Sequence, residues 1–254
     1  MKKWSIRIAL ILVALFVFAV AAVAVFLNGI VKKGVETAGP MITKVDVKLD
    51  RAAISIFSGS ANLRGLFIGN PPGYATDFAI KVADVSVSLK PMSVLSGKIV
   101  IQSINVKAPE ITIEGGLKNN NLTMIQSNVN AFSGGGSSGG SSAQSGTKKK
   151  FQVADLLVSG AILRVKSPLL AGKMVSVPLP DIHLTNLGTG PDGVTPAELA
   201  GKVMNSLMKE VVPAVTKLVS NVGADAIGLG KGAEKQGQNA LKKASGGLKS
   251  LFGH

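Results

Sequence analysis

The chain has 254 residues, a formal net charge of +14, 46% hydrophobic residues and no cysteine. The lack of cysteine excludes disulfide bonds and cysteine-ligated metal or redox centres. The chain has only two histidines, one of them the last residue, so a histidine-rich metal site is not expected. The length suits one domain, or at most two, with a buried core.

An unbroken apolar run comes first, from Ile8 to Leu27, and it contains no charged residue, glycine or proline. As a helix its 20 residues would measure roughly 30 Å, the thickness of a bilayer core. Lys2, Lys3 and Arg7 precede the run, which places the remainder of the chain across the membrane. A cleavable signal peptide is the alternative, but signal cores are shorter than this run. Residues 1–27 are therefore predicted to be a cytoplasmic stub and a single-pass anchor.

The next segment, residues 28–132, shows the period-two alternation of strands with one buried face. Turn-forming residues separate its strands, and we see no helical pattern between them, so we predict an antiparallel meander. One parity of these strands is aliphatic and is predicted to face inward. Its members are Val45, Val47, Leu49, Val85, Val87, Leu89, Ile99, Ile101, Ile111 and Ile113.

A Gly/Ser-rich insertion at residues 133–150 interrupts the strand pattern and ends in three lysines. Its composition is typical of a flexible coil. Strand-like segments then resume within residues 151–190, at 151–158, 161–166, 173–179 and 181–187. Because this stretch is too short for an independent core, we expect it to complete the sheet begun before the insertion.

An amphipathic helix is predicted at residues 195–222. Thr195, Pro196 and Glu198 form a capping-box sequence. The apolar stripe that follows consists of Leu199, Val203, Leu207, Val211, Val215 and Val219. This stripe suits either a cover for the sheet or contact with a membrane or protein partner. The Gly-rich basic tail, residues 223–254, is compatible with a solubilising tail or with a short interfacial helix.

Neither nucleic-acid binding nor catalysis is indicated. The positive charge is spread along the chain and aromatic residues are scarce, whereas nucleic-acid sites combine clustered basic residues with stacking aromatics. No nucleophile elbow, zinc-protease motif or phosphate loop is present. His183 stands in a strand-like run without a partnered nucleophile. We therefore predict no catalytic, cofactor-binding or metal-binding residues.

Several segments together resemble the N-terminal region of the AsmA family, over roughly residues 1–190. They are Gly39-Pro40-Met41-Ile42-Thr43, Leu63-Arg64-Gly65-Leu66, Ile68-Gly69-Asn70-Pro71-Pro72-Gly73-Tyr74, Ala108-Pro109-Glu110-Ile111, Asn121-Leu122 and Leu179-Pro180-Asp181-Ile182. The turn Gly69–Gly73 is the most specific of them. The resemblance implies a protein anchored in the bacterial inner membrane, with its bulk in the periplasm and with a curved β-groove that carries phospholipid or other acyl-chain lipid.

The expected fold is thus mainly β: an N-terminal transmembrane helix, a curved antiparallel half-pipe and a C-terminal amphipathic helix. The resemblance implies a non-enzymatic role in lipid transport and outer-membrane maintenance, with the ten inward aliphatic residues lining the groove. About nine or ten strands would extend only roughly 45 Å, so bridging the periplasm would require a homo-oligomer or a larger envelope protein. The alternative is a structural or adaptor protein that binds a protein partner through the helix at 195–222.

Overall fold

The computed structural model describes residues 11, 26–55, 57–134, 149–170 and 173–220. Most of the predicted anchor, the core of the Gly/Ser-rich insertion and the basic tail lie outside these residues. Within the described ranges, no helix is both long and apolar enough to cross a bilayer.

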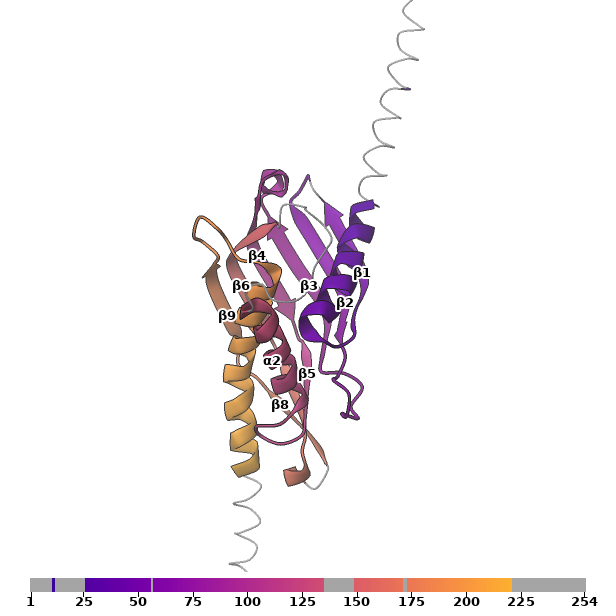
Figure 1. Cartoon of the computed structure of the whole chain (residues 1–254), viewed down its shortest axis with the longest axis vertical. Coiled ribbons are helices and arrows are strands. Elements are labelled where there is room, and N and C mark those ends of the chain that lie inside the picture. Colours follow the sequence, from indigo (N-terminus) through magenta and orange to yellow (C-terminus); the bar gives the residue numbers. More distant parts are fainter. Residues whose placement is uncertain (1–10, 12–25, 56, 135–148, 171–172, 221–254) are drawn as a thin grey trace, which may run out of the picture.

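The described residues form a mainly β structure, as predicted, with one nine-stranded sheet (Figure 1). Its strands are β1 (Val47–Ser55), β2 (Ser60–Ile68), β3 (Ile80–Leu89), β4 (Lys98–Lys107), β5 (Glu110–Glu114), β6 (Lys150–Ser159), β7 (Ile162–Lys166), β8 (Met174–Pro178) and β9 (Ile182–Leu187). Two short 3-10 helices, η1 (Pro91–Leu95) and η2 (Pro168–Leu170), join strands, and α2 (Asn121–Gly134) follows β5. Residues 26–43 and 196–220 are also helical, and we call them the N-terminal and C-terminal helices.

The sheet is mixed, so the predicted antiparallel meander is wrong. β4 pairs with β6 and β5 pairs with β7 in parallel, while the other pairings are antiparallel. A parallel pair needs a long crossover, and here α2 and the Gly/Ser-rich insertion supply it. The strands before and after the insertion therefore belong to one sheet.

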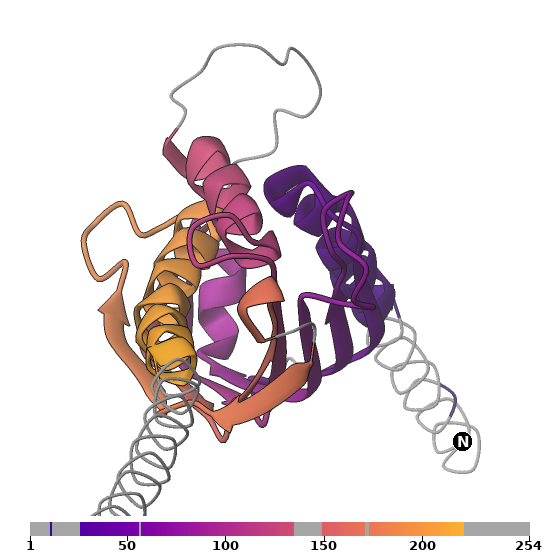
Figure 2. The ribbon, with the colours of Figure 1, turned by 90° about the horizontal axis from the view of Figure 1, so that it is seen from below.

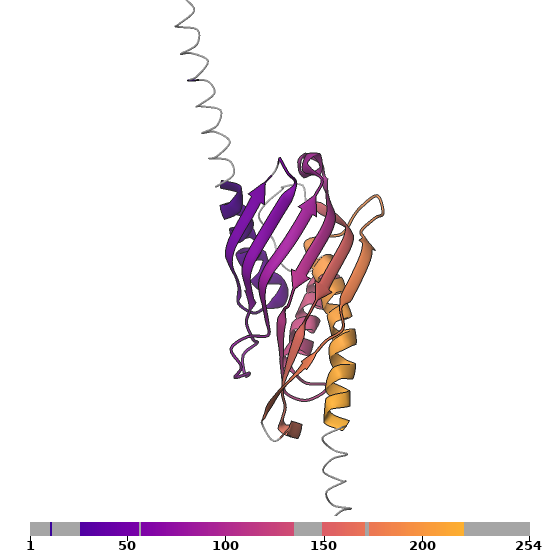
Figure 3. The same ribbon diagram turned by 180° about the vertical axis from the view of Figure 1, so that it is seen from behind.

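The sheet is curved and does not close: β1 forms one edge, and β8 and β9 form the other. Seen from below, it bends around the helices like a half-pipe (Figure 2). From behind, the strands lie in front and the helices lie beyond them, on the opposite face (Figure 3). We call the face that carries the helices the inner face.

A change of side-chain parity crosses the sheet along one line and accompanies the curvature. It falls within β1, β2 and β3, and in the segments that join β4 to β5, β6 to β7 and β8 to β9. A second phase change occurs between Ile101 and Ile104 on β4 and between Val153 and Leu156 on β6. Such irregularities bend strands and increase their twist. The inner-face residues on either side of this line are Leu49 and Ala52, Leu63 and Leu66, Val82 and Val85, Val106 and Ile111, Val158 and Ala161, and Leu179 and Ile182.

Gly65 shows why one strand can make this shift. It lies in the middle of β2 with φ of +64°, a left-handed conformation that is costly for residues with a Cβ atom. A Cβ atom there would also overlap the carboxylate of Asp50 on β1. The strand can therefore turn its side chains over at this point only with glycine.

Candidate functional site

The ten aliphatic residues predicted to line a groove all lie on the inner side of the sheet. Val45, Ile101, Ile111 and Ile113 belong to the hydrophobic core, and Val87, Leu89 and Ile99 pack against it. Val47, Leu49 and Val85 are buried. The register joins these positions across strands, for example Val85 to Val106 and Val87 to Ile104. These positions therefore share the inner face with the core, and the sequence could not show which part of that face is covered.

The half of the inner face that carries β5 and β7 is closed by protein. Ile111 on β5 and Leu163 on β7 are 1% and 0% exposed. The helix α2 contributes its own fully buried stripe of Leu122, Ile125 and Val129 to the same core. Because Ile111 and Ile113 serve this core, a lipid could reach them only by displacing α2.

The C-terminal helix covers the part of the inner face formed by β6. Leu207, Val211 and Val215 of its predicted stripe are buried in the core, and Leu199, Val203 and Val219 pack against that core. The predicted capping box is confirmed: Thr195 N donates to Glu198 Oε2 at 2.7 Å, and Glu198 N donates to Thr195 Oγ1 at 3.1 Å. The backbone hydrogen bond from Thr195 lowers the pKa of Glu198. This apolar stripe therefore covers the sheet, which is one of the two uses predicted for it.

The inner face is less covered on β2, β3 and β4, from the middle of the sheet to the end where η1 lies. Six of its aliphatic side chains there are only half-buried, although Val85 and Ile101 on the same strands are buried, in contrast to the almost fully buried residues beneath α2. We call these residues the half-buried strip. They are Leu63 on β2, Val87 and Leu89 on β3, and Ile99, Ile104 and Val106 on β4.

The N-terminal helix covers the free edge of β1. Its side chains at every fourth position bond backbone groups that no strand satisfies: Asn28 Oδ1 accepts from Ile54 N at 2.8 Å, and Glu36 Oε1 accepts from Leu49 N at 3.2 Å. Between them, Lys32 Nζ donates to Asp50 O at 3.1 Å. An exposed strand edge invites pairing with other chains, and this polar stripe blocks it.

Assigning residues 28–43 to the β-groove was therefore an error, and two observations explain the helix found there. Asn28, Lys32 and Glu36 follow a four-residue spacing that places them on one side of a helix. At Gly39 the helix lies so close to β1 that a Cβ atom would be 2.7 Å from Val47 Cβ. The glycine thus permits close packing against the strand.

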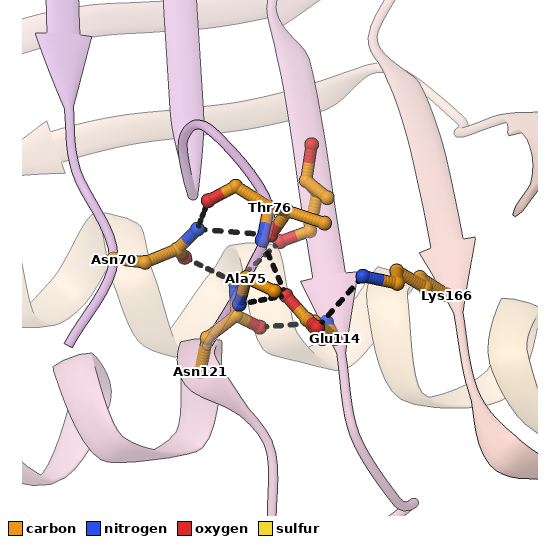
Figure 4. Close-up of polar contacts among 7 residues, drawn as sticks. Asn70, Ala75, Thr76, Glu114, Asn121 and Lys166 are labelled. Atoms are coloured by element: carbon orange, nitrogen blue, oxygen red, sulfur yellow. Dashed lines mark hydrogen bonds and ion pairs between the residues drawn. The ribbon is translucent and has the colours of Figure 1, made fainter. Parts of the chain in front are cut away.

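A polar cluster beneath the Asn-Pro-Pro-Gly turn fixes this turn to β5 and α2 (Figure 4). Asn121 is fully buried at the start of α2. Its amide donates to Asn70 Oδ1 at 2.6 Å and to Thr112 O at 2.8 Å, and its Oδ1 accepts from Glu114 N at 2.9 Å. β5 extends beyond its pairing with β3 at Ile111 and Ile80. The side chain of Asn121 therefore bonds the strand backbone where a neighbouring strand is missing.

The Glu114 carboxylate in this cluster is fully engaged. Oε2 accepts from Ala75 N at 2.9 Å and from Thr76 N at 2.7 Å, while Oε1 accepts from Lys166 Nζ at 3.0 Å. Burial alone would raise the pKa of Glu114, but these hydrogen bonds outweigh it and hold the pKa below its usual value. A carboxylate with both oxygens occupied positions the turn and is poorly suited to proton transfer. In the sequence, Asn70 and Asn121 stand out only as part of the family resemblance. No sequence pattern indicates that their side chains are in contact.

The outer face is polar, and several of its charged side chains are paired across strands. His183 lies exposed on β9 with Nε2 against Asp155 Oδ1. Asn62 donates to Asp84 at 2.8 Å, and this hydrogen bond is the main reason that the pKa of Asp84 is lowered. The described residues contain no group of three or more His, Asp or Glu placed to hold a metal ion. The ion pairs of the outer face are Arg164–Glu110, Arg64–Asp84, Lys166–Glu114 and His183–Asp155.

Comparison of the chain with protein-family models, with curated proteins and with solved structures gives no match.

Proposed function

We propose that this protein is a non-enzymatic, membrane-anchored protein of the bacterial envelope that binds the acyl chain of a phospholipid on its half-buried strip. The observation that carries this proposal is the unequal cover of the inner face. Leu163 and Val153 beneath the helices are fully buried, whereas Val87 and Leu89 keep part of their surface open. Aliphatic surface that is left partly open on the inner side of a curved sheet is suited to aliphatic ligands.

The sequence supports the rest of the proposal. The apolar run Ile8–Leu27 with basic residues before it favours an anchor in the inner membrane with the sheet in the periplasm. The resemblance to the AsmA family favours a role in lipid transport and outer-membrane maintenance. The curved, unclosed sheet agrees with the groove which that resemblance implies.

The helix α2 over β5 and β7 limits the kind of lipid transport that the protein can perform. A conduit needs an apolar face that is open from end to end, but α2 closes the inner face at Ile111 and Leu163. We therefore assign this protein to binding and handing over single lipids at one end of the sheet. The alternative role as an adaptor would need a surface other than the stripe of the C-terminal helix, because Leu207, Val211 and Val215 are buried in the core.

The test uses the full chain in detergent micelles that contain a phospholipid with a photoactivatable diazirine in its acyl chain. After irradiation, fragmentation mass spectrometry locates the modified residues. We expect adducts on the half-buried strip, at Val87, Leu89 and Ile104, in addition to adducts on the anchor. Adducts confined to the anchor, or spread equally over the outer face, would contradict the proposal.

A matched pair of substitutions on β3 strengthens the test. Val87→Asp places a charge on the inner face, whereas Ser88→Asp places the same charge on the outer face, where Ser88 Oγ donates to Gln102 at 3.2 Å. A carboxylate against an acyl chain costs more than about 1.4 kcal/mol, so Val87→Asp should lower strip adducts at least about tenfold. Ser88→Asp should leave them unchanged. Circular dichroism checks that both variants keep the sheet.

A further inference from the structure

The most exposed hydrophobic side chains of the described residues gather at one end of the molecule. Among large hydrophobic residues, the four most exposed are Leu95 (81%), Phe57 (79%), Met92 (76%) and Phe26 (72%). Met92 and Leu95 belong to η1, between β3 and β4. Phe57 lies in the turn between β1 and β2, and Phe26 is the first described residue of the N-terminal helix.

Hydrogen bonds show that these three segments are neighbours. The turn that contains Phe57 contacts the end of β3, where Leu89 N donates to Gly59 O at 2.7 Å. The start of the N-terminal helix lies beside the same end of β1, because Ile54 N donates to Asn28 Oδ1 at 2.8 Å. Figures 1 and 3 show η1, the turn between β1 and β2 and the start of the N-terminal helix at the same end of the sheet. We call this end, with Phe26, Phe57, Met92 and Leu95, the apolar tip.

Three lysines flank η1 in the apolar tip. Lys149 Nζ donates to Val94 O at 3.0 Å and to Ser96 O at 2.6 Å, which fixes its charge against η1. Lys90 immediately precedes η1 and is exposed. Lys98 follows η1, and its Nζ donates to Gly190 O at 3.2 Å.

Two acids lie on the side of Lys98, so they offset only part of the charge of Lys90, Lys98 and Lys149. Asp192 is in the loop whose Gly193 packs closely on Lys98 and Lys150. The Glu198 carboxylate accepts from Thr195 N in the capping box. Exposed apolar side chains next to lysines are typical of surfaces that insert into the headgroup region of anionic membranes.

We propose that the apolar tip inserts into the surface of the same membrane that the apolar run Ile8–Leu27 spans. The inference rests on the anchored topology proposed above. The run ends at Leu27, inside the N-terminal helix and at the tip end of the sheet. The bilayer surface therefore lies next to the side chains that are most exposed among the described residues. Contact at Phe57, Met92 and Leu95 in addition to the anchor holds the strands at a fixed angle to the membrane.

This contact also brings the half-buried strip to the bilayer. Leu89 and Ile99 of the strip lie at the strand ends that flank η1. A lipid that enters the strip from the adjoining leaflet can keep part of its acyl chain in the membrane while the remainder lies on Val87 and Ile104.

The test uses single-cysteine variants of the full chain, which has no cysteine of its own. Leu95→Cys, Lys118→Cys and Val17→Cys are labelled with the environment-sensitive dye NBD. Lys118 is exposed in the loop after β5, at the opposite end of the sheet. The proteins are placed in nanodiscs of phosphatidylethanolamine and phosphatidylglycerol, with and without lipid that carries a quenching doxyl group.

We expect doxyl lipid to reduce the fluorescence at positions 95 and 17 at least about twofold and to leave position 118 unchanged. Quenching at position 17 with none at position 95 would overturn the proposed contact of the apolar tip with the membrane, but not the proposed anchor. Quenching at 95 with none at 17 would support the tip contact and overturn the anchored topology. In nanodiscs of phosphatidylcholine alone, quenching at 95 should weaken, and undiminished quenching would overturn the role given to the lysines.

A second variant tests whether the apolar side chains act together. With the dye at position 57, Leu95→Asp should reduce the quenching by doxyl lipid at least about twofold, because a carboxylate opposes insertion. Leu95 is 81% exposed, so this change should leave the fold intact. Equal quenching with and without Leu95→Asp would overturn the proposal that η1 and the neighbouring turn insert as one surface.

Discussion

Replacing Asn121 by leucine should destabilise the protein strongly, although the volume of the side chain changes little. Asn121 is fully buried, and its amide satisfies three groups outside its own helix: Asn70 Oδ1, Thr112 O and Glu114 N. Leucine can bond none of them. Each buried polar group that loses its partner costs about 1–3 kcal/mol, so three partly rehydrated groups give a loss of about 3–5 kcal/mol. That loss is a large share of the total stability of a typical domain.

Urea unfolding of the full chain in detergent, followed by far-ultraviolet circular dichroism of the sheet, measures this loss. Asn119→Leu is the matched control, because Asn119 is exposed in the loop two residues before Asn121. It should change the free energy of unfolding by less than about 0.5 kcal/mol. Asn121→Asp should lie between the two, since a carboxylate can accept from Glu114 N but cannot donate to Thr112 O. If Asn121→Leu is as stable as Asn119→Leu, the amide does not replace the missing strand beside β5.

Three further changes test other features of the structure. Glu114→Gln removes a carboxylate whose pKa is lowered in the folded state. Such a carboxylate stabilises the folded protein at pH values above its pKa in the unfolded chain. This stabilisation is lost as the pH falls through its pKa in the folded protein. The variant should therefore be about 1–2 kcal/mol less stable than the wild type at pH 7. In urea titrations this difference should shrink as the pH falls below the pKa of an unfolded glutamate. Thr195→Ala breaks the capping box and should cost about 1 kcal/mol by the same assay, with Thr216→Ala as an exposed control in the same helix. Gly65→Ala forces a Cβ atom into a left-handed conformation against Asp50 and should cost at least about 1–2 kcal/mol; a melting temperature equal to that of the wild type would refute the strain.

The strands after the insertion could be predicted from the sequence almost to the residue. The alternation in 161–166 gives β7, Ile162–Lys166, and the alternation in 181–187 gives β9, Ile182–Leu187. Glycine and proline mark their ends clearly, and one face of each strand is polar. The C-terminal helix was equally visible, because a capping box and a stripe at four-residue steps coincide. Local pattern and tertiary environment agree in these segments.

The pairing of the strands could not be predicted, because it depends on α2. Leu122, Ile125 and Val129 have helical spacing, but asparagine, serine and threonine surround them and weaken the pattern. Without this helix the sequence offers no crossover, and antiparallel pairing is then the expected arrangement for the strands on either side of the insertion. The N-terminal helix was missed for a related reason: Gly29, Gly34 and Gly39 lower its helix propensity, and its stabilising contacts are with the edge of β1.

The half-buried strip explains why one sheet can be both a folded core and a surface for lipid. If the strip shields half of each of about ten methylenes in an acyl chain, the binding free energy is roughly 4 kcal/mol. This value corresponds to a dissociation constant of about 1 mM. A bilayer shields all of the methylenes, so the strip alone cannot extract a lipid into water. It can hold a chain that still touches the membrane, and this requires that its open end, at Leu89 and Ile99, lie at the bilayer surface. The two proposals therefore depend on each other physically: an apolar tip held away from the membrane would leave the strip without a source of lipid.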